Sequence, residues 1–404
     1  MLSLSKHEPV EGSKQWRASV SVLLLFAVTS CSRTFAPAPP VQGAARGVMA
    51  APGITVLGNR LVTTDAGNLG GVHVRAHEPV VLRGVNLSGA EYACLQEHAF
   101  WDNPKGNQAT IEAMLRWRAN VVRVPLNEEC WLGINGAPKA YSGARYQRAI
   151  ADFARLANAS GLIVEVDLHW GAPGTGLPNS DRYPGLDKDH APAFWQSVAT
   201  AFKSNRSVIF NMINEPYITS WSCYRNGGCT TPRVGKLGRW RVVGTQSVLD
   251  TIRASGAKNV VIVAGLNFSN NLSDWLKYAP KDSARAIVAG VHVYFDDLTC
   301  ENPACWTKEL GAIQDAGYPV VLDEFGEFDC GHEKIDRLMD WADARSPQIG
   351  YWAWSWNPFS CSKGPSLITD DAGNPTQTYG SGFQKRLESI QPAPVSLRAC
   401  PVSP

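Results

Sequence analysis

Eight short apolar segments of strand type recur between residues 81 and 355, and stretches of helical periodicity separate them. The strand segments are 81–86, 121–125, 162–168, 208–213, 260–264, 287–293, 320–323 and 351–355. Continuous apolar runs are typical of strands covered on both faces, and long crossovers favour parallel pairing. The helical stretches include 109–118, 142–158, 191–203, 237–254 and 332–344. We therefore predict an α/β fold whose strands close into a (β/α)8 TIM barrel.

A doubly wound open sheet is the alternative for this alternation of strands and helices. Such a sheet normally carries a glycine-rich phosphate turn directly after its first strand. Here the first strand runs into Asn86-Leu-Ser-Gly-Ala-Glu91, which contains no such turn. Gly171, Gly174 and Gly176 follow the third strand without the Gly-x-Gly-x-x-Gly spacing. We interpret them as part of a loop at the functional end of the barrel.

The residues before the barrel indicate export. Basic residues at 14 and 17 precede an apolar run at 20–28, which is too short to cross a bilayer. Val28-Thr-Ser-Cys31 resembles a bacterial lipobox, so we predict a signal peptide over 1–31 with lipid on Cys31 as the membrane attachment. Plain cleavage near Ser30, with secretion, is the alternative. We predict a linker at 32–53, a domain at 54–392 and a tail at 393–404, with a small β-hairpin at 54–74 covering one end of the barrel.

Ten cysteines in an exported chain indicate disulfides rather than free thiols. The chain has no Cys-x-x-Cys motif, which argues against structural zinc. Two pairs are close in sequence, and two further pairs follow neighbouring strands of the predicted barrel. The expected bridges are Cys223–Cys229, Cys300–Cys305, Cys94–Cys130 and Cys330–Cys361, which leaves Cys400 over. A net charge of +2 does not indicate a nucleic-acid partner.

Two glutamates stand at the ends of buried strands about a hundred residues apart. Glu215 follows Val-Ile-Phe-Asn-Met-Ile-Asn214, and Glu324 follows Val-Val-Leu-Asp323. The carboxyl ends of barrel strands meet on one face, so we expect the two carboxylates to lie together. Paired carboxylates supply the acid and the nucleophile that hydrolysis of an acetal needs. Side-chain alternation predicts that Asp323, next to Glu324, points away from the cavity.

The strand ends carry an ordered series of polar and aromatic residues, one set per strand. The series is Arg123, His169, Asn214 with Glu215, His292 with Tyr294, Glu324 and Trp354. In this series the chain resembles the cellulase-type family 5 glycoside hydrolases over residues 80–387. The resemblance implies a retaining hydrolase with Glu215 as acid/base and Glu324 as nucleophile. It implies substrate-binding roles for Arg123, His169, Asn214, His292, Tyr294 and Trp354, and no cofactor or metal.

The individual roles also follow from physical chemistry. A nucleophilic carboxylate must stay ionised, and we expect Arg123 and Tyr294 to keep Glu324 charged. Ionised Glu324 favours the protonated form that an acid at 215 needs. Asn214 is placed to bind the sugar 2-hydroxyl, and Trp354 to form the floor under the ring. Glu165 and Glu327 are rival carboxylates, but one lies inside its strand and the other in a loop.

The expected substrate is a β-glucan polysaccharide or oligosaccharide, and the expected activity is that of an endo-β-1,4-glucanase. A β-1,3-glucanase is an alternative because His169-Trp-Gly-Ala-Pro-Gly174 resembles a loop of such enzymes, and a β-mannanase is another. A carbohydrate-binding barrel without turnover is the alternative of a different class. A metal hydrolase is disfavoured because the histidines lack a ligand motif such as His-Glu-x-x-His. Tryptophans expected to line an open cleft are Trp101, Trp131, Trp170, Trp221 and Trp306.

Overall fold

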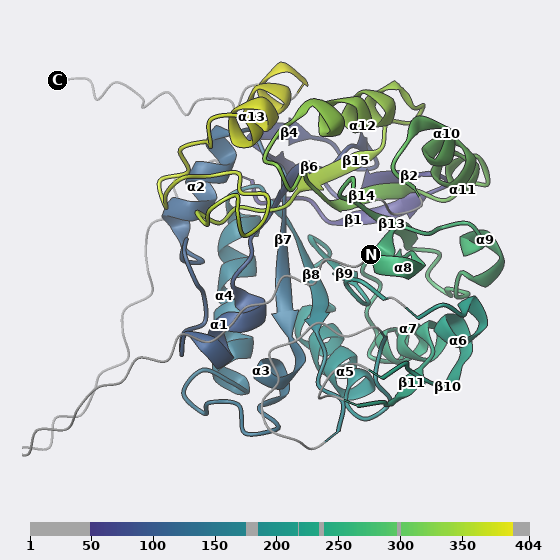
Figure 1. Cartoon of the computed structure of the whole chain (residues 1–404). Helices are drawn as coiled ribbons and strands as arrows, with labels where there is room; N and C mark the ends of the chain where they lie inside the picture. Colours follow the sequence, from purple (N-terminus) through teal and green to yellow (C-terminus); the bar gives the residue numbers. More distant parts are fainter. Residues whose placement is uncertain (1–48, 175–184, 217, 234–237, 297–299, 391–404) are drawn as a thin grey trace, which may run out of the picture. The chain divides into compact units, whose positions relative to one another are not determined.

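A closed barrel of eight parallel strands forms the centre of the domain (Figure 1). The computed structural model describes residues 49–174, 185–216, 218–233, 238–296 and 300–390, so Cys31, Cys400, the predicted signal peptide, the tail and most of the linker lie outside the described residues. The strands are β6 (Arg83–Asn86), β7 (Val121–Asn127), β8 (Ile163–Trp170), β9 (Val208–Asn211), β12 (Val261–Ala264), β13 (Ile287–Val293), β14 (Val320–Phe325) and β15 (Gly350–Ala353). Each overlaps one predicted strand. Pairing of β15 with β6 closes the sheet, which confirms the (β/α)8 prediction and excludes the open sheet.

Helices follow the strands and pack outside them. The longer ones are α2 (Gln108–Arg116), α4 (Ala144–Ala159), α5 (Ala191–Phe202), α7 (Thr245–Ala254), α12 (Glu333–Ala344) and α13 (Tyr379–Ile390). Shorter helical segments are α1 (Ala90–Gln96), α3 (Glu128–Leu132), α6 (Trp221–Asn226), α8 (Leu266–Ser269), α9 (Trp275–Tyr278), α10 (Pro303–Trp306), a π-helical turn at Thr307–Gly311, and α11 (Ala312–Asp315). Among the described residues, none of these helices combines the length and apolar character that crossing a membrane requires.

One predicted helix is wrong in its first half. The sequence predicted a helix over 237–254, but Arg241–Val243 forms strand β11, which pairs with β10 (Gly227–Thr230). The β-branched pair Val242-Val243 favours a strand, and Gly244 then precedes the true helix start at Thr245. The Cys223–Cys229 disulfide joins α6 to β10 and so fixes this ribbon beside the barrel.

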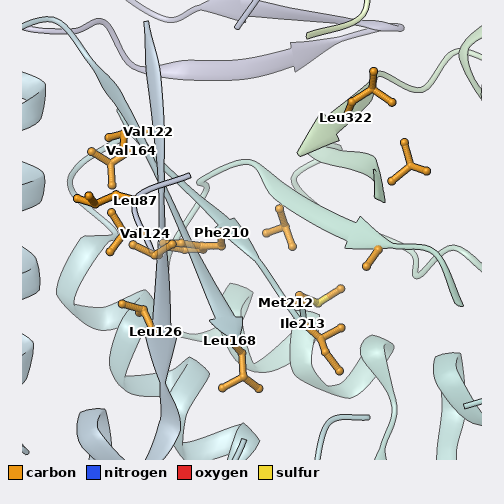
Figure 2. Close-up of a cluster of buried hydrophobic side chains, with 14 of the residues drawn as sticks. Leu87, Val122, Val124, Leu126, Val164, Leu168, Phe210, Met212, Ile213 and Leu322 are labelled. Atoms are coloured by element: carbon orange, nitrogen blue, oxygen red, sulfur yellow. The ribbon is translucent and has the colours of Figure 1, made fainter. Parts of the chain in front are cut away.

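The core lies in two regions. The first is the layer between strands and helices, which contains side chains such as Val122, Val164 and Phe210 (Figure 2). The second fills the amino-terminal end of the barrel, where inward side chains such as Ile163 and Trp352 meet residues from the start of the domain, including Ile54. Burial of these side chains is the main favourable term for the fold, at about 25 cal/mol for each Å² of apolar surface.

The predicted hairpin at the start of the domain is part of a larger cover. Strands β1 (Ile54–Leu57), β2 (Arg60–Thr63) and β5 (Pro79–Val80) form a three-stranded antiparallel sheet, and β3 (Gly67–Leu69) pairs with β4 (Val72–Val74). This cover packs on the amino-terminal end of the barrel, as predicted. The preceding residues also contact the barrel, because the Ser207 hydroxyl donates to the carbonyls of Ala51 and Pro52. Chemistry is therefore left to the opposite, carboxyl end.

Among the described residues, four disulfides lie in the connections at that carboxyl end, two of them between connections and two within one. They are Cys94–Cys130, Cys223–Cys229, Cys300–Cys305 and Cys330–Cys361, and they confirm the four expected pairings. Each cysteine lies in a connection that follows a barrel strand. The loops that surround the strand ends are thus covalently restrained.

Candidate active site

Glu215 and Glu324 lie together at the carboxyl end of the barrel. Glu215 follows β9, Glu324 belongs to β14, and both are buried. One oxygen of Glu215, one of Glu324 and one nitrogen of His292 all lie within 4.8 Å of one another. The sequence therefore located both carboxylates on the same end of the barrel and within one site.

Glu324 accepts hydrogen bonds at both of its oxygens. Arg123 donates from Nη1 to Oε2 at 2.6 Å, and the Tyr294 hydroxyl donates to Oε1 at 2.5 Å. Burial raises the pKa of Glu324, but the positive charges of His292 and Arg123 outweigh it, so the pKa lies below its usual range. Burial and the charge of Glu324 raise the pKa of Tyr294, which keeps the phenol protonated as a donor. The carboxyl at 324 is thus held in its ionised form.

Arg123 is the centre of a buried polar network. Its Nε contacts Glu165 at 3.0 Å, and its Nη2 contacts Asp167 at 3.0 Å and the Asn214 amide oxygen at 2.6 Å. Burial disfavours the charged guanidinium, but Asp167, Glu324 and Glu165 outweigh this cost and raise its pKa. The guanidinium of Arg123 therefore orients both Asn214 and Glu324.

His292 lies between the two candidate carboxylates. Its Nδ1 is 3.1 Å from Oε1 of Glu215 and 3.8 Å from Oε1 of Glu324, while its Nε2 is 3.7 Å from Oδ2 of Asp323. Burial lowers the pKa of His292, but these three acids raise it to about 10. The imidazole is therefore protonated at neutral pH and binds Glu215 as a donor.

His169 and Trp354 form one wall of the site. Their rings are stacked, with centroids 5.5 Å apart and an angle of 13° between the planes. Nδ1 of His169 lies 3.0 Å from Oδ2 of Asp167, which also binds Arg123. Trp354 is partly exposed at the end of β15, where a sugar ring can reach its face.

The orientation predicted for Asp323 is wrong. Its Oδ2 accepts a hydrogen bond of 2.6 Å from Asn211, and it faces His292, so the side chain lies inside the barrel below Glu324. The pairing of β13 with β14 shifts between Gly290 and His292, where β14 contains one more residue than β13. This bulge places two successive acidic side chains on the same side of the strand.

The rival carboxylates have structural partners. Glu165 binds Arg123 and also accepts from Asn211 at 3.1 Å below the site. Burial raises the pKa of Glu165 well above its usual range against the opposing charge of Arg123. Glu327 lies in the loop after β14, where its Oε1 accepts from the backbone N–H groups of Lys334 and Ile335 at the start of α12. Neither arrangement directs a carboxylate at a substrate.

Most of the tryptophans expected to line the cleft are core residues instead. Four are buried among apolar side chains: Trp101, Trp131, Trp221 and Trp306. Trp131, for example, packs against Tyr146 and Phe194 and donates from its indole N–H to Ser197. Trp170 remains partly exposed at the end of β8, with its ring 6.1 Å from that of Tyr92. Sequence position in a loop did not distinguish packing from exposure.

Sequence reasoning missed three residues that hold the site together. Asn86 accepts from Arg123 at 2.9 Å and donates to the carbonyl of Trp352. Asp167 joins Arg123 to His169, and Asp323 faces His292. All three stand near the carboxyl ends of predicted strands, which was the available indication of a role.

The carboxylate pair also has the composition of a metal-ligand set. Among the described residues, Glu215, His292 and Glu324 bring possible ligand atoms together, and so do Cys300, Cys305 and Glu309. The two cysteines are disulfide-bonded and lack thiolates. Both oxygens of Glu324 already accept hydrogen bonds, one of them from a guanidinium. The positive charge of the Arg123 guanidinium beside Glu324 repels a metal cation at the same carboxylate. The arrangement therefore fits proton transfer and nucleophilic attack better than metal binding.

Comparison with known proteins agrees with this geometry. Residues 75–360 match the family model Cellulase (glycosyl hydrolase family 5). The chain belongs to glycosyl hydrolase family 5, which confirms the resemblance seen in the sequence.

Two bacterial relatives are endoglucanases. Endoglucanase A of Paenibacillus barcinonensis is 24% identical over 57% of this chain and 66% of the relative. Endoglucanase A of Ruminococcus albus is 25% identical over 59% of this chain and 68% of the relative. The matched region thus spans about two thirds of each of these relatives.

Solved structures share the fold. The β-glucanase SdGluc5_26A from Saccharophagus degradans, in complex with cellotetraose, aligns with a TM-score of 0.59 and 19% identity over 88% of this chain and 98% of that chain. The catalytic domain of endoglucanase Cel5A from Thermobifida fusca aligns with a TM-score of 0.55 and 18% identity over 83% and 97%. At these identities the likeness supports the barrel alone.

Proposed function

We propose that the protein is a retaining endo-β-1,4-glucanase in which Glu324 is the nucleophile and Glu215 the acid/base. The observation that carries this proposal is the pair of carboxyl oxygens within 4.8 Å of each other. Retaining glycosidases place their carboxyl groups about 5–5.5 Å apart, whereas inverting enzymes need about 6.5–9.5 Å to admit a water molecule. The short distance between Glu215 and Glu324 favours the retaining mechanism, because it leaves no room for a water molecule between the sugar and Glu324.

In the first step, an ionised oxygen of Glu324 attacks the anomeric carbon and forms a glycosyl ester. The bond to the leaving oxygen breaks as Glu215 transfers its proton to that oxygen. Before the reaction the negative charge of Glu324 favours a proton on Glu215, against protonated His292, which favours the ionised form of Glu215. Arg123 and Tyr294 hold the attacking group in place, which lowers the entropic cost of reaching the transition state.

In the second step, Glu215 takes a proton from water, and the resulting oxygen attacks the anomeric carbon and displaces Glu324. Formation of the ester removes the charge at 324, so Glu215 is more readily ionised and can act as the base. His292, 3.1 Å from Glu215, stabilises that ionised form. Asn214, oriented by Arg123, is placed to bind the 2-hydroxyl as positive charge develops on the ring.

The family and its relatives support a β-glucan as the substrate. A further relative, endo-β-1,4-glucanase A of Emericella nidulans, 26% identical over 53% of this chain and 64% of the relative, favours the 1,4 linkage. The partly exposed ring of Trp354 supports a sugar bound next to His169. We also propose that the enzyme acts outside the cell, since four disulfides are stable in an oxidising compartment.

The test combines trapping with replacement. A 2-fluoro cellobioside with a good leaving group should label Glu324, and mass spectrometry of peptides should locate the ester. Glu215→Gln and Glu324→Gln should each nearly abolish hydrolysis of an aryl cellobioside, and Glu112→Gln, at an exposed carboxylate on α2, serves as the control. A panel of β-1,4-, mixed-linkage and β-1,3-glucan and mannan fixes the linkage. Label on another residue, or near-normal turnover in either variant, refutes the assignment.

A further inference from the structure

Phe328 is an exposed aromatic side chain next to the candidate active site. Among the described residues, four large hydrophobic side chains are strongly exposed: Met49, Leu57, Leu276 and Phe328. Phe328 has 54% of its surface exposed, and its ring stacks on that of Tyr294 with centroids 5.2 Å apart and planes at 26°. A single exposed apolar residue is ordinary on a protein surface. Phe328 differs from the other three because it contacts Tyr294, a residue of the candidate active site.

Tyr294 connects Phe328 to the proposed nucleophile. The Tyr294 hydroxyl donates to Glu324, and the face of its phenol ring stacks on the ring of Phe328. Tyr294 thus contacts both Phe328 and Glu324. A sugar in contact with Phe328 is accordingly a neighbour of the sugar that Glu324 attacks.

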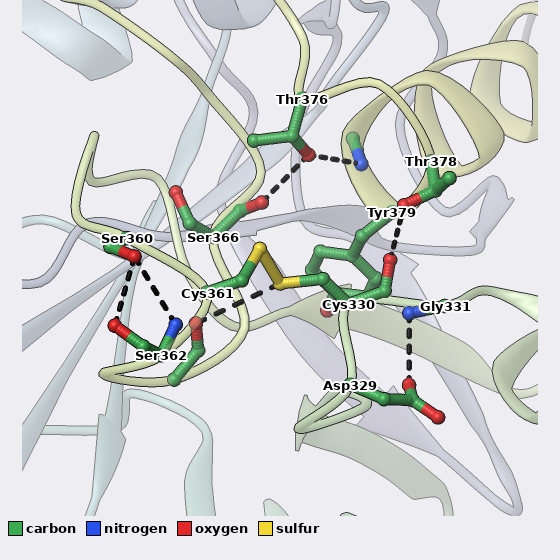
Figure 3. Close-up of a disulfide and its surroundings, with 12 residues drawn as sticks. Asp329, Cys330, Gly331, Ser360, Cys361, Ser362, Ser366, Thr376, Thr378 and Tyr379 are labelled. Atoms are coloured by element: carbon green, nitrogen blue, oxygen red, sulfur yellow. Dashed lines mark hydrogen bonds between the residues drawn. A yellow bond between two sulfur atoms is a disulfide. The ribbon is translucent and has the colours of Figure 1, made fainter.

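The loop that carries Phe328 is anchored on both sides of it. Before it, Glu327 binds the N–H groups of Lys334 and Ile335 at the start of α12. After it, Cys330 forms a disulfide with Cys361, and its carbonyl accepts from the Thr378 hydroxyl (Figure 3). A side chain held in this way loses little conformational entropy when a ligand covers it.

We propose that Phe328 is a binding platform for a pyranose ring of the glucan adjacent to the ring that reacts. The faces of a β-linked glucose ring consist of C–H groups, which pack against the negative face of an aromatic ring. Stacking on Tyr294 covers one face of Phe328, and the exposed surface is available to the sugar. The inference rests on the proposed hydrolysis of β-1,4-glucan and adds a contact outside the reacting position.

The test measures binding separately from turnover. In a Glu324→Gln background, the dissociation constant for cellohexaose is measured by calorimetry with and without Phe328→Ala. We expect Phe328→Ala to weaken binding about tenfold, which corresponds to about 1.4 kcal/mol, and Phe328→Trp to retain it. In the otherwise native enzyme, Phe328→Ala should raise KM for cellohexaose similarly and change kcat less than twofold. Leu57→Ala, which removes an exposed side chain from the cover at the opposite end, is the matched control.

The possible results are distinct. If wild-type enzyme does not cleave cellohexaose, the proposed function fails. If wild-type enzyme cleaves it and Phe328→Ala binds it as tightly, the platform proposal alone is wrong. If Phe328→Ala lowers kcat and leaves KM and binding unchanged, the residue acts only by supporting Tyr294, and the platform is again refuted. Loss of binding in Phe328→Ala with retention in Phe328→Trp confirms it.

Discussion

The hydroxyl of Tyr294 lies 2.5 Å from Oε1 of Glu324, and this hydrogen bond is made to the oxygen opposite the one that Arg123 holds. The two donors fix the carboxylate plane and leave each oxygen with one remaining lone pair for the sugar. Since hydrogen bonds to a charged acceptor favour the ionised form, the same geometry that aims the nucleophile also lowers its pKa.

Replacement of Tyr294 by Phe should reduce kcat about 10- to 100-fold, because a hydrogen bond to a charged group contributes about 1.5–3 kcal/mol. The lost donor should also raise the pKa of Glu324. The acidic limb of the kcat/KM profile should then move to higher pH, which a pH series from 3 to 9 would show. Tyr318→Phe, remote from the site and packed on Trp275, is the control. An unchanged acidic limb would contradict the assigned role.

Replacement of Arg123 by Met should destabilise the fold as well as abolish activity. The change leaves the carboxylates of Glu165, Asp167 and Glu324 buried without their positive partner. This should lower the free energy of unfolding by about 3–5 kcal/mol. Arg123→Lys keeps the charge but cannot contact all of these partners at once, so it should be intermediate. Urea unfolding measures the free energy, with the exposed Arg155→Met as control. A variant as stable as wild type would show that the network is dispensable.

Replacement of Asp323 by Asn should change the pH dependence of stability through His292. The charges that face this imidazole are those of Glu215, Asp323 and Glu324. The stabilisation from protonated His292 is complete below the ordinary histidine pKa and is lost as the pH rises through about 10. Without Asp323 the pKa of folded-state His292 falls, so this stabilisation should be smaller at neutral pH and its loss should be complete at lower pH.

Melting temperatures of wild type and Asp323→Asn between pH 6 and pH 10 measure this effect. The difference between the two proteins should be largest near pH 6, where His292 is protonated in both folded proteins, and should shrink toward zero as the pH approaches 10. Asp336→Asn is the control, because Asp336 pairs in the same way with His332, which is only partly buried. Parallel curves across the whole range would mean that Asp323 does not control the charge of His292.

Removal of the Cys330–Cys361 disulfide by double replacement with Ser should cost about 3–4 kcal/mol, because it closes a loop of 31 residues. The same replacement at Cys300–Cys305, which closes a loop of 5 residues, should cost about 2 kcal/mol. Loss of the first bridge should also raise KM for cellohexaose, since it anchors the loop of Phe328. Equal effects of the two bridges on unfolding and KM would argue against this reasoning.

The sequence predicted the barrel because eight apolar runs separated by helical stretches indicate parallel strands covered on both faces, and because no glycine-rich phosphate turn follows the first run, as an open sheet would normally require. It also predicted the bridges between cysteines of adjacent loops, since barrel topology places those loops together. It failed where local context decides the outcome. The bulge in β14 reverses the orientation expected for Asp323, and Val242-Val243 forms a strand inside an apparent helical pattern.

The site residues were predictable to the extent that strand ends mark them. Glu215, Glu324, Arg123 and His292 all lie in or directly after the strands to which the sequence assigned them. The partners of these residues, such as Asn86, were not predictable because hydrogen-bond geometry depends on register between strands. Burial of Trp131 was not predictable either, since it depends on helices distant in sequence.

The disulfides of the described residues all lie in connections that follow barrel strands, and none of them joins two strands of the barrel. Protein produced in the reducing cytosol of a laboratory host should therefore contain an intact barrel whose loops lack their disulfides. Its circular dichroism spectrum should be that of a folded protein, but its hydrolytic activity should be low. Expression through an oxidising compartment is consequently the right starting point for every measurement of this enzyme.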